Sequence, residues 1–229
     1  MGSEELGAAY EGQDEHGPFP CEHSRQVYTR PPPLKGYVSI PCLIVNMVSA
    51  RGNCQVLDFA GGSGYIYYRI KPYMTAPSHV VWHVVDSNEI ELELRRNFSL
   101  KDGHIQFFSQ LPDNKTNQYD VVYINTSLQY IEDYSSILAE LLLFNPAYLA
   151  LTRLLASEME SCVTSQNVMG KRTPCKIINI AEFSTFLVSQ GYKLIYKSPT
   201  EEVVLDYFKD VSDNLKIPFS LALIYEKNR

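Results

Sequence analysis

The residues best suited to hold a nucleotide are an acid and three glycines in the stretch VLDFAGGSGY, residues 56–65. An apolar run leads to Asp58, and Gly61, Gly62 and Gly64 follow closely. Glycines after a strand let the backbone approach a ligand, and in parallel sheets such turns lie at the edge where ligands bind. We therefore predict a strand followed by a nucleotide-binding turn.

The spacing of the glycines bears on which nucleotide is held. A dinucleotide fingerprint G-x-G-x-x-G that starts at Gly62 requires a third glycine at position 67, where the chain has Tyr67. A P-loop requires Lys and then Ser or Thr after its last glycine, and Tyr65 follows Gly64. The spacing thus excludes a P-loop and counts against a dinucleotide.

A second acid stands where a ribose ligand is expected. The run VVWHVVDS contains Asp86 at its carboxyl end. Nucleotide-binding sheets place an acid after the second strand, about 20 residues beyond the turn, where it binds the ribose hydroxyls. The alternative is a carboxylate that only caps the following helix.

Candidate substrate ligands follow two later strands. Gln129 and Tyr130 come after the run DVVYIN, and Arg153 closes the run YLALT. A guanidinium at the carboxyl end of a strand suits an anionic substrate, and a surface salt bridge is an equally weighted alternative. We predict that Tyr130, Gln129 and Arg153 position the substrate, and that His83 is structural.

Composition restricts the class of protein. The chain has 229 residues, a hydrophobic fraction of 45% and a net charge of −6, which favours a globular protein that binds no nucleic acid. No apolar run approaches the roughly 18 residues of a membrane span, and acids follow the first Met, so we expect a cytoplasmic protein that contacts no membrane. The five cysteines form no C-x-x-C pair, so we expect no metal.

Strand and helix patterns alternate over most of the chain, which is typical of an α/β fold with a mainly parallel sheet. We predict strands at residues 55–60, 79–86, 104–108, 119–125, 148–152, 192–197 and 220–226, and helices at 37–51, 63–71, 88–97, 133–144 and 180–190. The last two strands lack a clear crossover helix between them, which favours an antiparallel pair near one edge. Residues 1–36 read as an N-terminal arm that serves as a substrate lid, and the polar segment Leu155–Lys176 as an irregular substrate wall.

The stretch around Asp58 resembles the D-x-G-x-G-x-G signature of the class I S-adenosylmethionine-dependent methyltransferases. Ala60 stands where that family usually has its first glycine, and Gly62 and Gly64 match the other two. The stretches LDFAGGSGYIYYRIKP, DVVYINTSLQYIEDY and LTRL are similar to a bacterial group of methyltransferases associated with biosynthesis. This resemblance covers residues 37–229 and implies a Rossmann-like, doubly wound, mainly parallel seven-stranded sheet with an antiparallel last strand.

The resemblance also implies the cofactor, S-adenosyl-L-methionine, and transfer of its methyl group. We expect the acceptor to be an oxygen or nitrogen of a small metabolite, and Arg153 favours an anionic one. The residues that the resemblance places at the cofactor are Asp58, Ala60, Gly61, Gly62, Gly64, Tyr65, Asp86, Ser109, Gln110, Asn125 and Thr126. Three alternatives stay open: a transfer other than methyl from the same cofactor, an inactive partner subunit with this fold, and an NAD(P) oxidoreductase. A homodimer is also left open.

Overall fold

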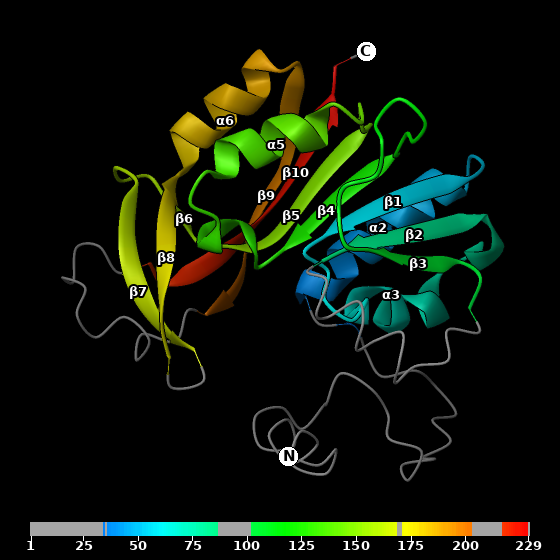
Figure 1. Ribbon diagram of the computed structural model, residues 1–229, viewed down its shortest axis with the longest axis horizontal. Helices are drawn as coiled ribbons and strands as arrows, with labels where there is room; N and C mark the ends of the chain where they lie inside the picture. Colours follow the sequence, from blue (N-terminus) through cyan, green and yellow to red (C-terminus); the bar gives the residue numbers. More distant parts are fainter. Residues whose placement is uncertain (1–33, 35, 87–101, 169–170, 203–216, 229) are drawn as a thin grey trace, which may run out of the picture. The chain divides into compact units, whose positions relative to one another are not determined.

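The computed structural model (Figure 1) describes residues 34, 36–86, 102–168, 171–202 and 217–228. Most of the predicted arm, residues 1–36, and the whole predicted helix 88–97 lie outside the described residues. Among the described helices, none is long and apolar enough to cross a membrane.

A seven-stranded sheet forms the centre of the fold, in the order β3-β2-β1-β4-β5-β10-β9. The strands are β1 (Cys54–Phe59), β2 (Val80–Val85), β3 (Ile105–Phe108), β4 (Val121–Asn125), β5 (Tyr148–Leu154), β9 (Tyr192–Glu202) and β10 (Phe219–Lys227). The first five pair in parallel, and β10 lies antiparallel between β5 and β9. The prediction of a mainly parallel sheet with an antiparallel last strand is confirmed.

Helices cover both faces of this sheet (Figure 1). They are α2 (Gly36–Ser49), α3 (Tyr65–Ile70), α5 (Tyr134–Leu142) and α6 (Ile180–Ser189), with the short 3-10 helices η1 (Lys71–Tyr73), η2 (Pro77–His79) and η3 (Leu128–Tyr130). One apolar core joins α2 and α3 to one face, and a second core joins α5 and α6 to the other. Strands covered on both faces are apolar along their length, which explains runs such as VVYIN in β4.

Local hydrogen bonds set where the helices begin. The Asn179 side chain accepts from Glu182 N at 2.8 Å and caps α6, and the Asp133 carboxylate accepts from Ser136 N at 3.1 Å and caps α5. Ser39 lies inside α2, which begins at Gly36, and its hydroxyl donates to Gly36 O at 2.7 Å instead of capping the helix.

The segment predicted to lack regular structure, Leu155–Lys176, instead contributes to a second sheet. Its strands are β6 (Ala156–Ser157), β7 (Cys162–Val168) and β8 (Lys171–Asn179), in the order β6-β8-β7. Leu155, Cys175, Ile177 and Ile217 form a small buried cluster there. The strands were missed because polar residues dominate the segment and leave only these few apolar positions to anchor it.

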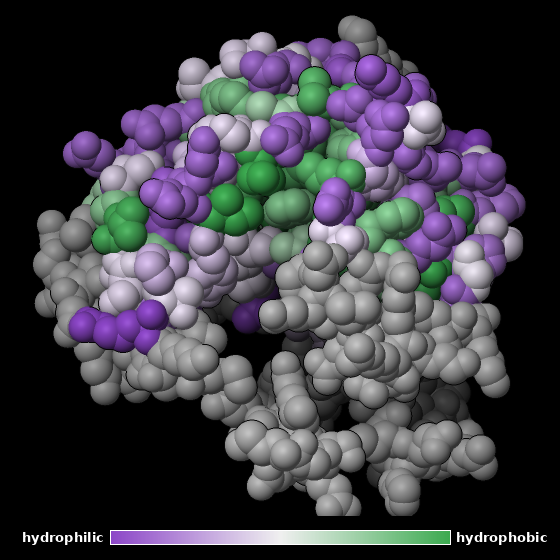
Figure 2. Space-filling model, viewed as in Figure 1, coloured by the Kyte–Doolittle hydropathy of each residue, from purple (hydrophilic) through white to green (hydrophobic). Residues whose placement is uncertain are grey.

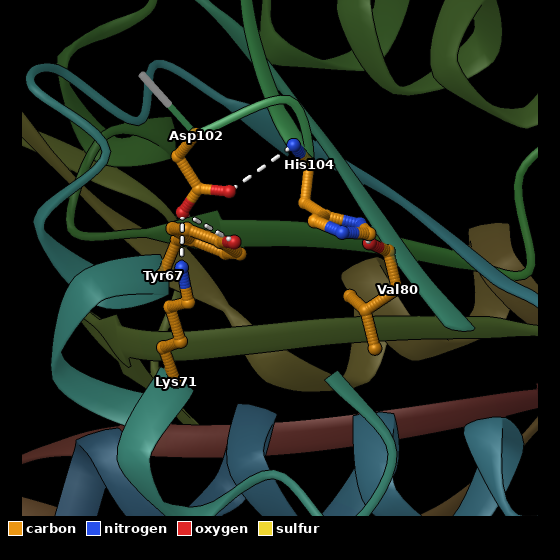
Figure 3. Close-up of polar contacts among 5 residues, drawn as sticks. All are labelled: Tyr67, Lys71, Val80, Asp102 and His104. Atoms are coloured by element: carbon orange, nitrogen blue, oxygen red, sulfur yellow. Dashed lines mark hydrogen bonds and ion pairs between the residues drawn. The ribbon is translucent and has the colours of Figure 1, made fainter. Parts of the chain in front are cut away.

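A partly exposed ion pair and the hydrogen bonds around it fasten α3 and η1 to the turn before β3 (Figure 3). Asp102 accepts hydrogen bonds from Lys71 Nζ at 2.5 Å, Tyr67 Oη at 2.9 Å and His104 N at 3.2 Å. His104 Nδ1 lies 3.1 Å from Val80 O. This network lies at the amino ends of β2 and β3, so it supports the sheet from the edge opposite the glycine turn.

The face that carries α5 and α6 has apolar residues among the polar ones (Figure 2). Leu143, just after α5, is 63% exposed, and Val188 of α6 is 57% exposed. These side chains face away from the core that the same helices bury, so they take no part in placing the residues at the carboxyl ends of the strands.

Candidate functional site

The glycine turn leaves the carboxyl end of β1 in a left-handed backbone conformation. Ala60, Gly62 and Gly64 have φ angles of 53°, 56° and 71°. Ala60 N donates to Val85 O at 2.8 Å, which fixes the start of the turn against β2. A Cβ on Gly64 would lie 2.6 Å from Ile105 Cδ1, so a side chain there would displace Ile105 of β3, and the positive φ of Gly64 also favours glycine.

Asp58 is buried beneath this turn. Trp82 Nε1 donates to Asp58 Oδ2 at 3.0 Å, and Asp58 Oδ1 has no hydrogen-bond partner within the described residues. Burial raises the pKa of Asp58 to about 7, with a smaller rise from the nearby charge of Asp86, although the Trp82 hydrogen bond opposes it. Asp58 therefore shapes the turn and keeps one oxygen free to accept a further hydrogen bond.

Asp86 follows β2 directly and meets the glycine turn. Gly62 N donates to Asp86 Oδ2 at 2.6 Å, and Asp86 N donates to Phe108 O at 3.0 Å. The two acids singled out by the sequence thus lie at the same turn. This is the arrangement needed for a carboxylate to receive ribose hydroxyls beside a close backbone.

Three further residues predicted near the cofactor are attached to elements that end near the same turn. Ser109 and Gln110 follow β3, whose last residue pairs with Val85 at the end of β2. Tyr65 begins α3 immediately after the turn, and the Arg69 guanidinium lies 5.9 Å from its ring centroid. All three are therefore attached to the ends of elements that meet at Asp86 or Gly64.

The ends of β4 and β5 are joined by side chains and backbone. Asn125 pairs in register with Thr152, and Thr126 N donates to Thr152 O at 3.0 Å. Asn125 Oδ1 lies 2.9 Å from Thr152 Oγ1 and 3.2 Å from Thr126 Oγ1, both of which donate to it. Tyr123 Oη lies 2.7 Å from Thr152 Oγ1.

Two residues at these strand ends hold a strained backbone. Thr126 has a φ of 63° and Arg153 a φ of 56°, although neither is a glycine. Such residues cost about 1–3 kcal/mol each and cluster at functional sites, because surrounding contacts must hold them there. The strained backbone therefore indicates that the directions of the Thr126 and Arg153 side chains are fixed at the carboxyl ends of β4 and β5.

Gln129 lies in η3, directly after β4, and is only 3% exposed. Its Nε2 donates to Arg153 O at 3.4 Å, while its Oε1 and the Ser127 hydroxyl have no hydrogen-bond partner among the described residues. Buried polar atoms without partners are costly, so they indicate where a ligand would complete the structure.

Tyr130 and Arg153 each contact a residue that the sequence did not single out as a ligand. Tyr130 Oη donates to Gln166 Oε1 of β7 at 2.5 Å, and burial raises the pKa of Tyr130 above its ordinary value. The Arg153 guanidinium lies 5.1 Å from the ring centroid of Tyr37 in α2. Tyr37 and Gln166 were missed because they come from segments distant in sequence from the strand ends.

The described histidines are structural or lie away from this edge. His83 is buried in β2, its Nδ1 lies 2.7 Å from Tyr119 Oη, and burial lowers the pKa of its imidazole. The prediction of a structural role for His83 is confirmed. His79 and His104 lie at the amino ends of β2 and β3.

The sheet topology places the whole predicted set at one edge. Because β1, β2, β3, β4 and β5 run in parallel, their carboxyl ends lie on the same side of the sheet. The residues attached to these ends are Asp58, Ala60, Gly61, Gly62, Gly64, Tyr65, Asp86, Ser109, Gln110, Asn125, Thr126, Gln129, Tyr130 and Arg153. In doubly wound sheets this edge is where ligands bind.

Solved structures share this topology. A magnesium protoporphyrin IX methyltransferase from Synechocystis PCC 6803 with bound S-adenosylmethionine has 15% identity and a TM-score of 0.56, with 83% of this chain and 78% of that chain covered. The chain has the class I methyltransferase fold. A second methyltransferase with this fold, from Mesorhizobium loti, has 12% identity and a TM-score of 0.52 over 84% and 99% of the two chains.

A third structure of the class I fold contains both a substrate and a cofactor product. It is the 1,6-didemethyltoxoflavin-N1-methyltransferase from Burkholderia thailandensis, with 1,6-didemethyltoxoflavin and S-adenosylhomocysteine bound. Its identity is 13% and its TM-score 0.53, with 99% of this chain and 87% of that chain covered. No protein-family model and no curated protein sequence matches the chain.

Proposed function

We propose that the protein transfers a methyl group from S-adenosyl-L-methionine to a small-molecule metabolite with an anionic group, as a step in biosynthesis. The observation that carries the proposal is the contact of Gly62 N with Asp86 Oδ2 at 2.6 Å. It joins a left-handed glycine turn to an acid at the end of the neighbouring strand, which is the pair that a nucleoside requires.

The residues present fit this cofactor. In the proposal Asp86 receives the ribose hydroxyls, the backbone of Gly62 and Gly64 gives close approach, and Ser109 and Gln110 border the adenine. Asp58 Oδ1 has no partner in the described part of the chain and is an acceptor beneath the turn. When bound, the cofactor supplies a methyl group on a positively charged sulfur. The remaining residues assigned to it are Ala60, Gly61, Tyr65, Asn125 and Thr126.

The acceptor is assigned to the edge of β4 and β5. Arg153 supplies a positive charge there. Gln129 Oε1 is a buried oxygen that can accept a hydrogen bond from the substrate, and it has no hydrogen-bond partner among the described residues. Tyr130 is a phenol rather than a phenolate, since its pKa is raised and its hydroxyl donates a hydrogen bond to Gln166 Oε1. These groups hold and orient a substrate, and orientation alone supplies a large part of the rate in reactions of bound partners.

Two of the structural neighbours support a small acceptor. The substrates in their names are magnesium protoporphyrin IX and 1,6-didemethyltoxoflavin, which are small molecules rather than nucleic acids or proteins. A net charge of −6 on this chain agrees with an acceptor other than nucleic acid.

Titration calorimetry of the full chain with S-adenosylmethionine, S-adenosylhomocysteine and NAD tests the cofactor. We expect micromolar binding of the first two, and at least tenfold weaker binding in Asp86→Ala, because a hydrogen bond to a charged group contributes about 1.5–3 kcal/mol. Glu140→Ala is the matched control, since Glu140 is an exposed acid on α5. Binding of NAD alone, or no change in Asp86→Ala, contradicts the proposal.

Mass spectrometry then distinguishes the proposed methyl transfer from two alternatives, transfer of another group and an inactive subunit. Incubation of the protein with S-adenosylmethionine and a panel of small carboxylic acids, phenols and amines should give one product heavier by a methyl group. Transfer of another group from the cofactor supports the non-methyl reaction. Tight cofactor binding without any product supports an inactive subunit.

A further inference from the structure

We infer that Asn125 presents its Nδ2 amide to the methyl acceptor and thereby selects an oxygen of a carboxylate as the atom that is methylated. This inference rests on the proposed function and goes beyond it by naming the acceptor atom. It follows from the direction of the hydrogen bonds among Tyr123, Thr152 and Asn125.

The three side chains form a continuous chain of hydrogen bonds. Tyr123 Oη and Thr152 Oγ1 are 2.7 Å apart, and Thr152 Oγ1 and Asn125 Oδ1 are 2.9 Å apart. Thr126 Oγ1 reaches the same Asn125 oxygen at 3.2 Å. Each hydroxyl has a single proton, so fixing one donor in this chain fixes the direction of the others.

Tyr123 fixes that direction. It is fully buried, and Thr152 Oγ1 is the hydrogen-bond partner of its hydroxyl among the described residues. Burial keeps the pKa of Tyr123 far above its ordinary value, so the phenol retains its proton. If Thr152 donated to Tyr123, the buried phenolic proton of Tyr123 would have no acceptor among the described residues, which is costly. Tyr123 therefore donates to Thr152, and Thr152 donates to Asn125 Oδ1.

Asn125 is consequently oriented as a donor. Its carbonyl oxygen accepts from Thr152 and Thr126, so its amide nitrogen points away from both hydroxyls. Within the described residues, Nδ2 makes no hydrogen bond, although Asn125 is half-buried at the end of β4. Two N–H groups are thus available to a ligand at this edge of the sheet.

An oxygen can use such a donor and still react, whereas an amine cannot. A carboxylate oxygen accepts a hydrogen bond with one lone pair and keeps another for attack on a methyl carbon. An amine nitrogen has one lone pair, and attack consumes it. Donors at Asn125 therefore hold an oxygen nucleophile in position but would block an amine.

The charge and proton balance of this edge favours a carboxylate over a hydroxyl. Arg153 supplies a positive charge, and the described histidines lie in β2 or at the amino ends of β2 and β3. A carboxylate needs no base: its oxygen forms the bond to the methyl carbon, the carbon–sulfur bond breaks, and that electron pair stays on sulfur. The products are a methyl ester and a neutral thioether, and no proton moves.

Nuclear magnetic resonance of the Asn125 side chain tests this directly, with benzoate and benzylamine as probes. The Asn125 Nδ2 resonance of the full chain is assigned by its loss in Asn125→Asp. We expect benzoate to shift it saturably, with and without S-adenosylhomocysteine, and benzylamine to leave it unchanged. A benzylamine shift, or no benzoate shift, overturns the inference.

Thr152 provides a matched pair of variants. Thr152→Val has nearly the same shape but cannot pass on the hydrogen bond, so the amide can reverse, and we expect benzoate to bind about tenfold more weakly. Thr152→Ser keeps the hydroxyl and should bind benzoate as the wild type does. Equal benzoate affinity in Thr152→Val and Thr152→Ser contradicts the inference. Thr152→Ala also removes the hydroxyl and should resemble Thr152→Val, which keeps the test decisive if the valine variant misfolds.

The carboxylate of the cofactor's own amino-acid end is the other source of an oxygen for Asn125. Because Asn125 also borders the cofactor in the proposed function, Asn125→Asp distinguishes the two by comparison: the inference predicts that benzoate affinity falls at least tenfold and by more than S-adenosylhomocysteine affinity. A loss of S-adenosylhomocysteine affinity with unchanged benzoate affinity overturns it. Failure of the proposed function appears separately, as absence of S-adenosylhomocysteine binding to the wild type.

Discussion

The carboxyl group of Asp58 lies directly against the α-carbon of Gly61. A Cβ built on Gly61 would come within 2.5 Å of Asp58 Cγ and 2.6 Å of its Oδ2. Asp58 and Gly61 therefore pack directly against each other, and this close packing holds the shape of the turn.

Gly61→Ala should destabilise the protein and weaken cofactor binding together. Forcing an extra carbon into a packed site costs about 1–3 kcal/mol, and Asp58 cannot move away because it is buried and held by Trp82. Urea unfolding and calorimetry with S-adenosylhomocysteine measure the two effects. Gly103→Ala is the control, since a Cβ there meets nothing within 4 Å. Equal stability of the two variants would contradict the packing relationship.

Ala60→Gly should stabilise the protein by about 0.5–1 kcal/mol. Ala60 has a φ of 53°, and a left-handed conformation costs an L-residue about 1–2 kcal/mol, from which the greater flexibility of glycine in the unfolded chain subtracts up to about 1 kcal/mol. Urea unfolding measures the change. Ala139→Gly, on the exposed surface of α5, should instead destabilise by about 1 kcal/mol, so a loss of stability in both variants contradicts the argument.

Periodicity and glycine spacing predicted the central sheet because its strands are buried on both faces and so are continuously apolar. They placed Asp58 and Asp86 near one turn for the same reason, since Asp58 lies at the end of one such strand and Asp86 follows another. Gln166 was beyond such reasoning, because β7 is polar and is identified by its pairing with β8. The sequence could have indicated Tyr123, because side chains alternate along a strand and this puts Tyr123 on the same face as Asn125. The direction of the hydrogen bonds between them could be derived only from the distances in the structure.

Asp58 should make stability fall as pH rises from about 5 to about 8. Its pKa is raised by burial to about 7, well above that of an exposed aspartate, so the folded state binds more protons than the unfolded state in this window. Asp58→Asn removes this titration. The difference in unfolding free energy between wild type and Asp58→Asn, from urea titrations, should be largest at pH 5 and shrink towards pH 8. A constant difference would show that Asp58 is already ionised at pH 5.

The hydrogen bond from Tyr130 to Gln166 should hold the β7–β8 pair against η3. Tyr130→Phe and Gln166→Ala each remove it, and an exposed or half-exposed hydrogen bond contributes about 0.5–1.5 kcal/mol, so local opening of β7 should become roughly 2- to 10-fold more frequent. Hydrogen exchange of the β7 amides measures that opening. The double variant should open no more than either single one, because both act on one contact. Tyr196→Phe is the control, since Tyr196 lies 41% exposed on β9. Additive effects of the two single substitutions would show that each residue holds the strands through a different partner.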